Sequence, residues 1–408
     1  MPLLESLVVS QDDQHRESMI LAGVRERFEE STDFTIGIEE EYQLLDPATL
    51  ALTNRFEDVV AAADPVFRER LAGELIASEV EYRTNKHDTF AAAARDLVQG
   101  RLATIALAER LGVSIGISGV HPFSQWPDQR IIDTPHYRLV ESGLGYVAWT
   151  NNTWSLHLHC GVRGADRAVA VSTAMRSVLP ELLALSANSA IFWGRATRLH
   201  STRTQVFSKS FPRCGVPDVF ADWDEYAAYV ALLERTGSIQ ESTQIWWSVR
   251  PHHSYGTLEV RICDGQTEMG EALAVGALAL ACIARFCQDY DDGIPLPAHP
   301  GRLIEENMWR AIRNGLDGRM IDFARGVDRP TVHAMEELLA WTTPVHDDLG
   351  LGPFVRQIPV MLADGNGAQR QLRRLEALGD VRAVHAEWVE RTRASAEELL
   401  NQLEAVAA

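Results

Sequence analysis

The chain has 408 residues, of which 46% are hydrophobic and 23% are charged, a balance typical of a globular enzyme with a large core. Its formal net charge of −19, with no run of five or more lysines and arginines, argues against a nucleic acid partner. The longest apolar run, residues 274–284, is too short to cross a membrane and the N-terminus lacks a signal-peptide pattern, so we expect a cytoplasmic protein.

The cysteines show neither paired spacing nor an even number. They are Cys160, Cys214, Cys263, Cys282 and Cys287. We therefore expect no disulfide framework and no zinc site. Cys282 and Cys287 fall within a predicted core helix, where buried free thiols are the default interpretation.

The first part of the chain is predicted to contain strands and one long helix. Residues 1–32 are charged and irregular, and we expect them to form a loose arm or one short helix ahead of a single catalytic domain over 33–408. Apolar spacing and composition distinguish the helix from the strands. The predicted elements are a strand at 34–46, a strand region at 72–84, a helix at 89–111, a strand at 113–123 and a loop at 124–150.

Strands continue to about residue 265 and helices follow. The predicted elements are a strand at 154–162, a helix at 165–192 kinked or divided by Pro180, a functional loop at 194–223, a hairpin of strands at 244–252 and 257–265, and helices near 268–290, 302–315, 331–343, 354–363 and 367–406. This order indicates an α+β fold in which helices pack on one face of an antiparallel or mixed sheet. The other face stays open for a site.

Four of the predicted strands place polar side chains two residues apart, and such residues share one face of a strand. The pairs are Glu39 and Glu41, Glu79 and Glu81, His157 and His159, and Glu259 and Arg261. One such pair alone is usually a solvated face, but here apolar residues flank the pairs. Aligned in one sheet, roughly five carboxylates and two imidazoles would converge, and cations such as Mg²⁺ or Mn²⁺ would have to neutralise them. We therefore predict a polynuclear metal site that handles nucleotide phosphates. Glu40, on the opposite face, is expected to tolerate substitution.

Ten motifs occur in a fixed order between about residues 34 and 370. They are FTIGIEEEYQLLD, EVEYRT, GISGVHPFSQW, HLHCGV, LPELLALSANSAIFWG, STRTQVF, FPRCGVPDVF, IWWSVRPH, GTLEVRICD and ENMWRAIRNGLDG. Together they resemble the glutamate–cysteine ligase type 2 family of bacterial carboxylate–amine ligases. That family is distantly similar to glutamine synthetase, which shares G-x-E-x-E, H-x-H and E-x-R strands. The resemblance implies a glutamine synthetase-like fold with a mostly antiparallel, curved sheet.

The resemblance also implies a reaction. ATP, with two or more Mg²⁺ or Mn²⁺ ions, would activate a glutamate-like carboxylate as an acyl phosphate. An amine, cysteine or another amino acid, would then displace phosphate. The chemistry accounts for the residues, because two anions must be brought together and the transferring phosphoryl group needs charge stabilisation. The implied partners are small-molecule acid and amine substrates, and we expect a homodimer.

Roles for single residues follow from the same resemblance. The implied metal ligands are Glu39, Glu41, Glu79, Glu81, His157 and Glu259. Arg261 and Arg250 are expected to contact phosphate, and Arg203 and Arg213 to close over the nucleotide or acyl phosphate. Trp246 and Trp247 are candidates for adenine stacking, Trp247 foremost, with core packing at least as favoured for both. The implied substrate-binding residues are Thr84, His121, His159 and Arg198. For His121, the capping of a turn is the alternative.

Two departures from the family pattern fall in the segment 190–203. Ala190 stands where a proline is expected, and Arg198-Leu199-His200 precede the Ser-x-Arg motif. We expect this segment, with Arg195, Arg198 and Arg203, to set the preference for the amine. Two other functions compete with the ligase. One is a metal-dependent phosphotransferase on the same scaffold, and the other is a catalytically inactive ligand-binding protein.

Overall fold

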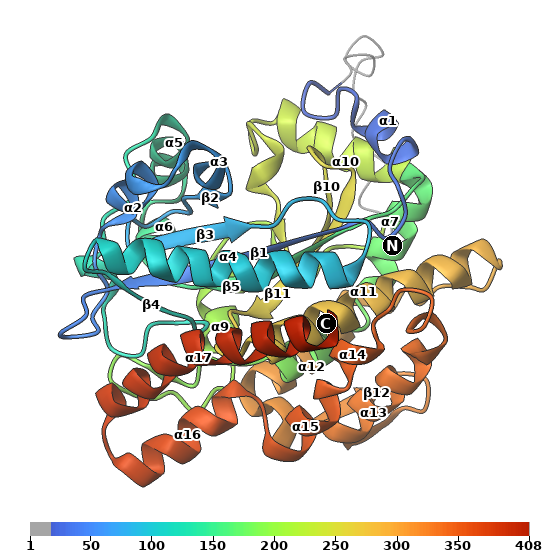
Figure 1. Ribbon diagram of the computed structural model, residues 1–408. Helices are drawn as coiled ribbons and strands as arrows, with labels where there is room; N and C mark the ends of the chain where they lie inside the picture. Colours follow the sequence, from blue (N-terminus) through green and yellow to red (C-terminus); the bar gives the residue numbers. More distant parts are fainter. Residues whose placement is uncertain (1–17, 408) are drawn as a thin grey trace.

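The computed structural model describes residues 18–407 (Figure 1), so most of the predicted N-terminal arm lies outside the described residues. Helix α1 (Val24–Glu29) forms within the rest of that arm. Val24 and Phe28 are buried in the main hydrophobic core, where α1 packs against α7 (Ala165–Met175). This part of the predicted arm is therefore packed onto the domain.

A seven-stranded sheet runs through the middle of the molecule, and each strand pair in it is antiparallel. Its strands are β1 (Ile36–Leu45), β2 (Leu71–Ala72), β3 (Glu79–Arg83), β4 (Ser114–Gly116), β5 (Ser155–Gly161), β10 (Val249–His252) and β11 (Thr257–Asp264). The order is β10-β11-β5-β1-β3-β2, and β4 also pairs with β1. The prediction of an open, mostly antiparallel sheet is confirmed. The four strands that carry the polar pairs, β11, β5, β1 and β3, are consecutive neighbours.

Helices cover one face of this sheet (Figure 1). Helix α4 (Phe90–Arg110) packs on β1, α8 (Leu179–Ser186) on β11, α11 (Met269–Asp291) on β5 and α7 on β10. Helix α17 (Val381–Ala407) lies against α4. Helix α11 is long and apolar enough to span a membrane by composition, but 89% of its most apolar stretch is buried inside the protein. It is the central core helix, and Cys282 and Cys287 on it are buried free thiols as predicted.

The two faces of β1 explain how the core and the site are separated. Ile36, Ile38 and Leu44 point with Glu40 toward the helices and are buried. Glu40 is neutralised there by a fully buried ion pair with Arg101 of α4. The predicted face of Glu40 is therefore right. Its predicted tolerance in turnover stays a prediction, but the loss of a charge from a buried pair should destabilise the fold.

The predicted helix at 165–192 is divided at Pro180, as expected. Helices α7 and α8 meet at a bend of 60°, and Pro180 occupies the first turn of α8, where its missing N–H is not needed. The strand predicted at 113–123 is only three residues long, as β4. The second strand region splits into β2 and β3 with an intervening loop that carries Glu74.

Two segments predicted as loops contain helices. Residues 124–150 form α5 (Pro135–Leu144) and α6 (Tyr146–Trp149), and the side chain of Thr134 caps α5. Val140 of α5 packs on Leu75 in a small cluster separate from the main core. Residues 194–223 contain α9 (Thr202–Ser208), capped by Ser201, because Ser and Thr at a helix start satisfy free amides.

The hairpin predicted from 244–252 and 257–265 forms, but its first strand is shorter. Trp246–Trp247 (β9) leaves the main sheet and pairs in parallel with β8 (Cys214–Gly215). The C-terminal part is helical apart from one hairpin, β12 (Arg319–Asp322) with β13 (Val327–Pro330). The remaining elements are α2 (Phe56–Ala62), α3 (Pro65–Arg68), β6 (Ile191–Phe192), β7 (Arg195–Ala196), α10 (Trp223–Arg235), α12 (Gly301–Asn314), α13 (Thr331–Thr342), α14 (Gly352–Val355), α15 (Gln357–Asp364) and α16 (Gly367–Leu378).

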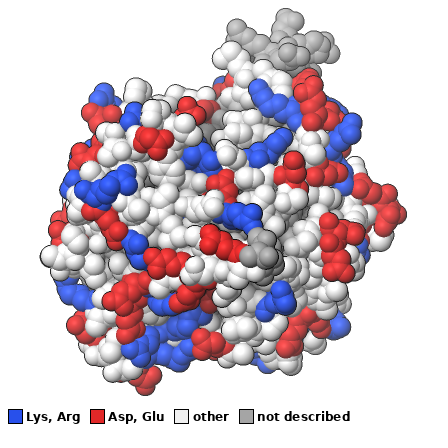
Figure 2. Space-filling model, in the orientation of Figure 1, with Lys and Arg blue, Asp and Glu red and all other residues white. Residues whose placement is uncertain are grey.

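Acidic and basic side chains are mixed over the face shown in Figure 2. Arginines gather at its lower left, over α16, where they pair with neighbouring carboxylates. Arg374 contacts Glu387 at 2.6 Å and Arg373 contacts Asp364 at 3.2 Å. The positive charges of these surface arginines are therefore largely neutralised by neighbouring carboxylates.

Candidate active site

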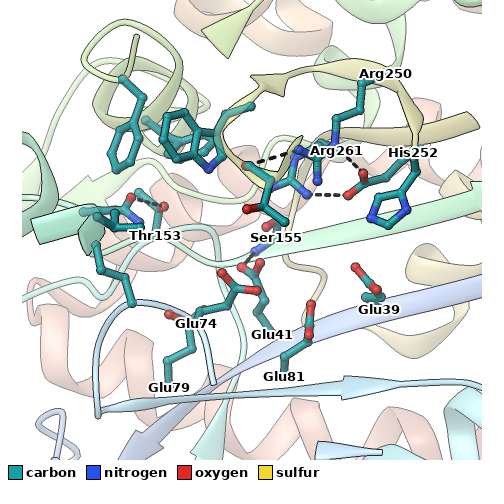
Figure 3. A pocket seen from close by; sticks show the side chains of 18 of the residues that line it. Glu39, Glu41, Glu74, Glu79, Glu81, Thr153, Ser155, Arg250, His252 and Arg261 are labelled. Carbon is teal, nitrogen blue, oxygen red and sulfur yellow. Dashed lines mark hydrogen bonds and ion pairs between the residues drawn. The ribbon is translucent and has the colours of Figure 1, made fainter. Parts of the chain in front are cut away.

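The carboxylates predicted from the strand pattern converge on a cavity of about 300 Å³ on the sheet face opposite the helices. Glu39 and Glu41 of β1 line it. Glu41 is the cross-strand partner of Glu81, and Glu79 of β3 shares that face two residues earlier. Figure 3 shows these carboxyl groups directed toward one another from neighbouring strands, together with Glu74 from the loop between β2 and β3.

Strand β5 adds two histidines to the same face. His157 Nδ1 lies 3.3 Å from Glu39 Oε2, and His159 Nε2 lies 3.3 Å from Glu39 Oε1. His159 Nδ1 is 3.0 Å from the hydroxyl of Thr257, which orients the ring, and His159 is the cross-strand partner of Glu259. The Nε2 atoms of both histidines are buried and face carboxylate oxygens, His157 Nε2 at 3.8 Å from Glu41 Oε1 and His159 Nε2 at 3.3 Å from Glu39 Oε1. His159 thus lies among the donors that could hold a cation, and its implied role in substrate binding stays a prediction.

Three sets of donor atoms could each hold a cation, since their ligand atoms lie within 4.8 Å of one another. They are Glu39 with Glu81 and His157, Glu39 with His159 and Glu259, and Glu41 with Glu74 and Glu81. Carboxylate oxygens dominate these sets, and such hard ligands suit Mg²⁺ or Mn²⁺. The buried imidazole nitrogens that face these carboxylates fit the same interpretation.

Crowding changes how these carboxyl groups ionise. Burial, reinforced by neighbouring carboxylates, raises the pKa of Glu74 to about 8. The same causes raise the pKa values of Glu79 and Glu81 well above the usual range. Burial also opposes ionisation of Glu39, but the positive charge of His159 and hydrogen bonds from the histidines outweigh it and hold the pKa of Glu39 well below its usual value. Without a cation, part of the cluster therefore carries protons.

Arginines form the wall beside β11. Arg250 Nε donates a 2.6 Å hydrogen bond to Glu259 Oε2, and Arg261 donates to Glu259 Oε1. Burial would raise the pKa of Glu259, but the two guanidinium groups hold it well below the usual range. Arg203 lines the same cavity and donates to the backbone carbonyls of Ile262 at 3.0 Å and Arg261 at 3.1 Å, so it braces β11.

Of the two adjacent tryptophans, Trp246 lines the cavity, whereas Trp247 does not. Trp247 is buried and stacks on Tyr229 with ring centroids 5.6 Å apart, so the core-packing alternative is the correct one. Arg213 lies over the Trp246 ring and donates to the carbonyl of Gln244, outside the cavity lining. The parallel pairing of β8 with β9 causes this arrangement.

Two residues expected in the acid-substrate pocket have structural contacts elsewhere. The Thr84 hydroxyl accepts a 2.8 Å hydrogen bond from the Ile38 amide and closes the end of the β1–β3 ladder. His121 is fully buried, accepts a 2.8 Å bond from the Ser124 amide and lies 3.0 Å from the carbonyl of Leu50. His121 therefore caps a turn, which was the alternative interpretation, and neither residue lines the cavity.

The segment 190–203 reaches the cavity only through Arg203. Arg195 and Arg198 are exposed, and Arg198 has a φ of 65° after the hairpin of β6 and β7. The expectation that Arg195 and Arg198 line the amine site is wrong, because this hairpin turns their side chains to solvent.

Several cavity residues were not predicted from the sequence. They are Glu74, Leu75, Arg83, His136, Tyr137, Val140, Asn151, Thr153, Ser155, Phe207, Phe211, Thr243, His252, Ser254 and Tyr255. Most lie on loops or on α5 and α9, where no strand alternation points to a face. Arg83 on β3, Ser155 on β5 and His252 on β10 are exceptions, since each stands two residues from a predicted site residue on its own strand and shares its face.

Comparison with known proteins identifies the family. The profile of Glutamate-cysteine ligase family 2 matches residues 35–392. The chain belongs to this family. A candidate glutamate–cysteine ligase 2-2 of Rubrobacter xylanophilus is 38% identical over 88% of this chain and 92% of that protein. A candidate glutamate–cysteine ligase 2 of Solibacter usitatus is 37% identical over 88% and 93%. The predicted identity as a glutamate–cysteine ligase-like ligase is confirmed.

Solved structures of low sequence identity share the fold. A bifunctional glutathione synthetase from Pasteurella multocida has a TM-score of 0.65 at 13% identity, covering 92% of this chain and 54% of that one. A glutamate–cysteine ligase from Francisella tularensis, solved in complex with AMP, has a TM-score of 0.63 at 12% identity, covering 92% and 93%. These neighbours support the predicted ligase fold of this glutamate–cysteine ligase family 2 member.

Proposed function

We propose that the protein is an ATP-dependent carboxylate–amine ligase that activates a glutamate-like acid as an acyl phosphate. Cysteine or another amino acid then displaces phosphate and forms the amide bond. One observation carries the proposal. Carboxylates of β1 and β3 line one cavity together with the Arg250–Arg261 wall, and the two imidazoles of β5 lie within the same sets of close donor atoms. Family membership and the related ligase solved with AMP support it.

The floor would hold the cations. Of the six ligands expected from the sequence, Glu39, Glu41, Glu81, His157 and Glu259 belong to the sets of close donors, and Glu79 lines the same cavity. Glu74 and His159 complete the sets. The bound divalent ions supply positive charge that reduces the repulsion between the triphosphate and the carboxylate of the acid substrate. With this charge in place, the carboxyl groups of the floor are held in their ionised form.

The arginine wall would act on the phosphates. Arg261 and Arg250 place guanidinium groups along one side of the cavity, where bidentate contacts to phosphate oxygens are favourable. They stabilise charge that develops as a carboxylate oxygen of the acid attacks the γ-phosphorus and ADP leaves. Nitrogen of the amine then attacks the acyl carbon, and phosphate leaves with the attacking oxygen. No nucleophilic side chain is required.

The test is an ADP-release screen with pairs of amino acids and Mg²⁺, followed by mass spectrometry of the product. With ¹⁸O in the carboxylate of the acid, the label should appear in the released phosphate. Unlabelled phosphate would refute the acyl-phosphate route. ADP release that needs the acid but no amine would instead indicate the phosphotransferase alternative.

A further inference from the structure

Four arginines line the cavity, and three of them are already held in place. Arg250 and Arg261 donate to Glu259, and Arg203 donates to backbone carbonyls of β11. The fourth, Arg83, is different. Its Nε lies 3.9 Å from Glu81 Oε2, and among the described residues its side chain donates one hydrogen bond, to the carbonyl of Glu69 at 3.4 Å.

The side chain of Arg83 is also accessible to a ligand in the cavity. It is the cross-strand partner of Glu39, so its side chain is on the cavity face of β3. Its side chain is 37% exposed, whereas that of Glu81 is only 5% exposed. A guanidinium group has five N–H donors. Most of those of Arg83 have no partner among the described residues.

Arg83 lies across the carboxylate floor from the arginine wall. In the sheet order, β5 and β1 stand between β11 and β3, a separation of three strand spacings, or about 14 Å. A triphosphate bound beside Arg250 and Arg261 therefore leaves Arg83 at the other side of the cavity. Leu75 and Val140, which pack on each other, give the cavity an apolar patch, and the whole cavity has the size for small ligands.

We propose that Arg83 binds the non-reacting carboxylate of an amino-acid substrate and thereby selects amino acids over simple acids or amines. The inference rests on the proposed ligase function. A planar guanidinium at the rim suits bidentate capture of a carboxylate. The contact replaces the one that Arg195 and Arg198 were expected to make. The carboxylate could belong to the acid substrate or to the amine substrate.

The test compares Arg83→Ala and Arg83→Lys with wild type and with Arg95→Ala, which changes an exposed arginine on the helix side of the sheet. ADP release is measured with Mg²⁺–ATP, L-glutamate and L-cysteine. Arg83→Ala should raise the KM of one amino acid by about 10- to 100-fold, the range for a lost hydrogen bond to a charged group, with kcat and the KM for ATP little changed. Arg83→Lys should recover only part of the loss, and Arg95→Ala should behave as wild type.

Two analogues identify the source of the carboxylate. 4-Aminobutanoate lacks the α-carboxylate of glutamate, and cysteamine lacks the carboxylate of cysteine. Arg83→Ala should not weaken further the use of the analogue that lacks the recognised group. The role of Arg83 would be refuted, and the proposed function left standing, if an active Arg83→Ala enzyme had unchanged KM values for both amino acids. A rise only in the KM for ATP would refute the role of Arg83 in the same way. Absence of amino-acid-dependent ADP release by the wild type would overturn the proposed function, and this inference with it.

Discussion

Replacement of Glu40 by glutamine is expected to destabilise the protein and to leave metal-dependent nucleotide binding intact. The Glu40 and Arg101 side chains are both fully buried, and Arg101 Nε donates to Glu40 at 2.9 Å. The hydroxyl of Tyr42 donates to the same carboxylate at 2.9 Å. A glutamine keeps one acceptor oxygen but removes the negative charge, so the guanidinium charge is left unpaired in the core. Such a one-sided loss typically costs about 3–5 kcal/mol.

The lower end of this range applies here, because Arg101 also donates to the backbone carbonyls of Gln266 and Thr267, each at 2.9 Å. With the usual unfolding entropy for a chain of this length, a loss of about 3 kcal/mol lowers Tm by roughly 4 °C. Calorimetric melting in EDTA measures this. The double variant Glu40→Leu with Arg101→Met should recover much of the stability, since it removes both buried charges together.

The matched control is Glu41→Gln, the same chemical change one residue further along β1. It should lower turnover by at least about 10²-fold, because a lost ligand misplaces metal and phosphate together. It should leave Tm in EDTA nearly unchanged, because a glutamine oxygen can still accept the hydrogen bond from the Ser155 amide and the lost charge relieves repulsion with the acidic neighbours. If Glu40→Gln instead abolishes metal-dependent binding while Glu41→Gln melts early, the faces of β1 have been assigned the wrong way round.

Three further predictions concern the cavity. Arg261→Lys should reduce kcat almost as much as Arg261→Ala, because the ammonium group of lysine cannot reproduce a bidentate phosphate contact. A near-normal kcat of the lysine variant would show that Arg261 only forms an ion pair with Glu259. ATP should bind measurably tighter in Mg²⁺ than in EDTA by calorimetry, and equal affinities would contradict the metal site. The raised pKa values of Glu74, about 8, and of Glu79 and Glu81 mean that Mg²⁺ binding at pH 7 should release protons, seen as a heat that depends on the ionisation enthalpy of the buffer. In EDTA these groups should contribute a stability that is present below pH about 4.5 and is lost as pH rises toward 8, since they ionise at a lower pH in the unfolded chain than in the folded one. Bound Mg²⁺ should abolish this loss of stability. A free energy of unfolding that rises between pH 4.5 and 8 in EDTA would contradict the raised pKa values.

Alternation along strands made the floor of the site predictable. A residue two positions from a known cavity residue must share its face, so the positions of Glu41, Glu81 and His159 follow once the strands are recognised. The same rule places Arg83 in the cavity. The sequence alone does not single out Arg83, because an arginine after an acidic pair is equally typical of the end of a strand.

The rim of the site could not be predicted in the same way. Glu74 lies on the loop between β2 and β3, where no period assigns a side chain to a face. Trp246 and Trp247 differ by one position, and only the pairing of β9 with β8, from a distant part of the chain, decides which one faces the cavity. Helix α5 has a capped start at Thr134 and Pro135, a local signal that the irregular composition of 124–150 obscured.

Glu259 shows why the floor and the wall have to be considered together. Its carboxylate belongs to one set of close donors, with Glu39 and His159, and it also accepts hydrogen bonds from Arg250 and Arg261. A carboxylate has about four lone-pair positions, so it can accept from two guanidinium groups and still offer one position to a cation. Loss of this one side chain would therefore remove a metal ligand and free both arginines at once. Glu259→Gln should accordingly weaken Mg²⁺ binding and raise the KM for ATP in the same variant. Glu81→Gln, a change in the floor alone, should mainly weaken Mg²⁺ binding. Metal titration by calorimetry and ATP kinetics on both variants would separate these effects, and a Glu259→Gln variant with wild-type KM for ATP would show that the arginines do not depend on it.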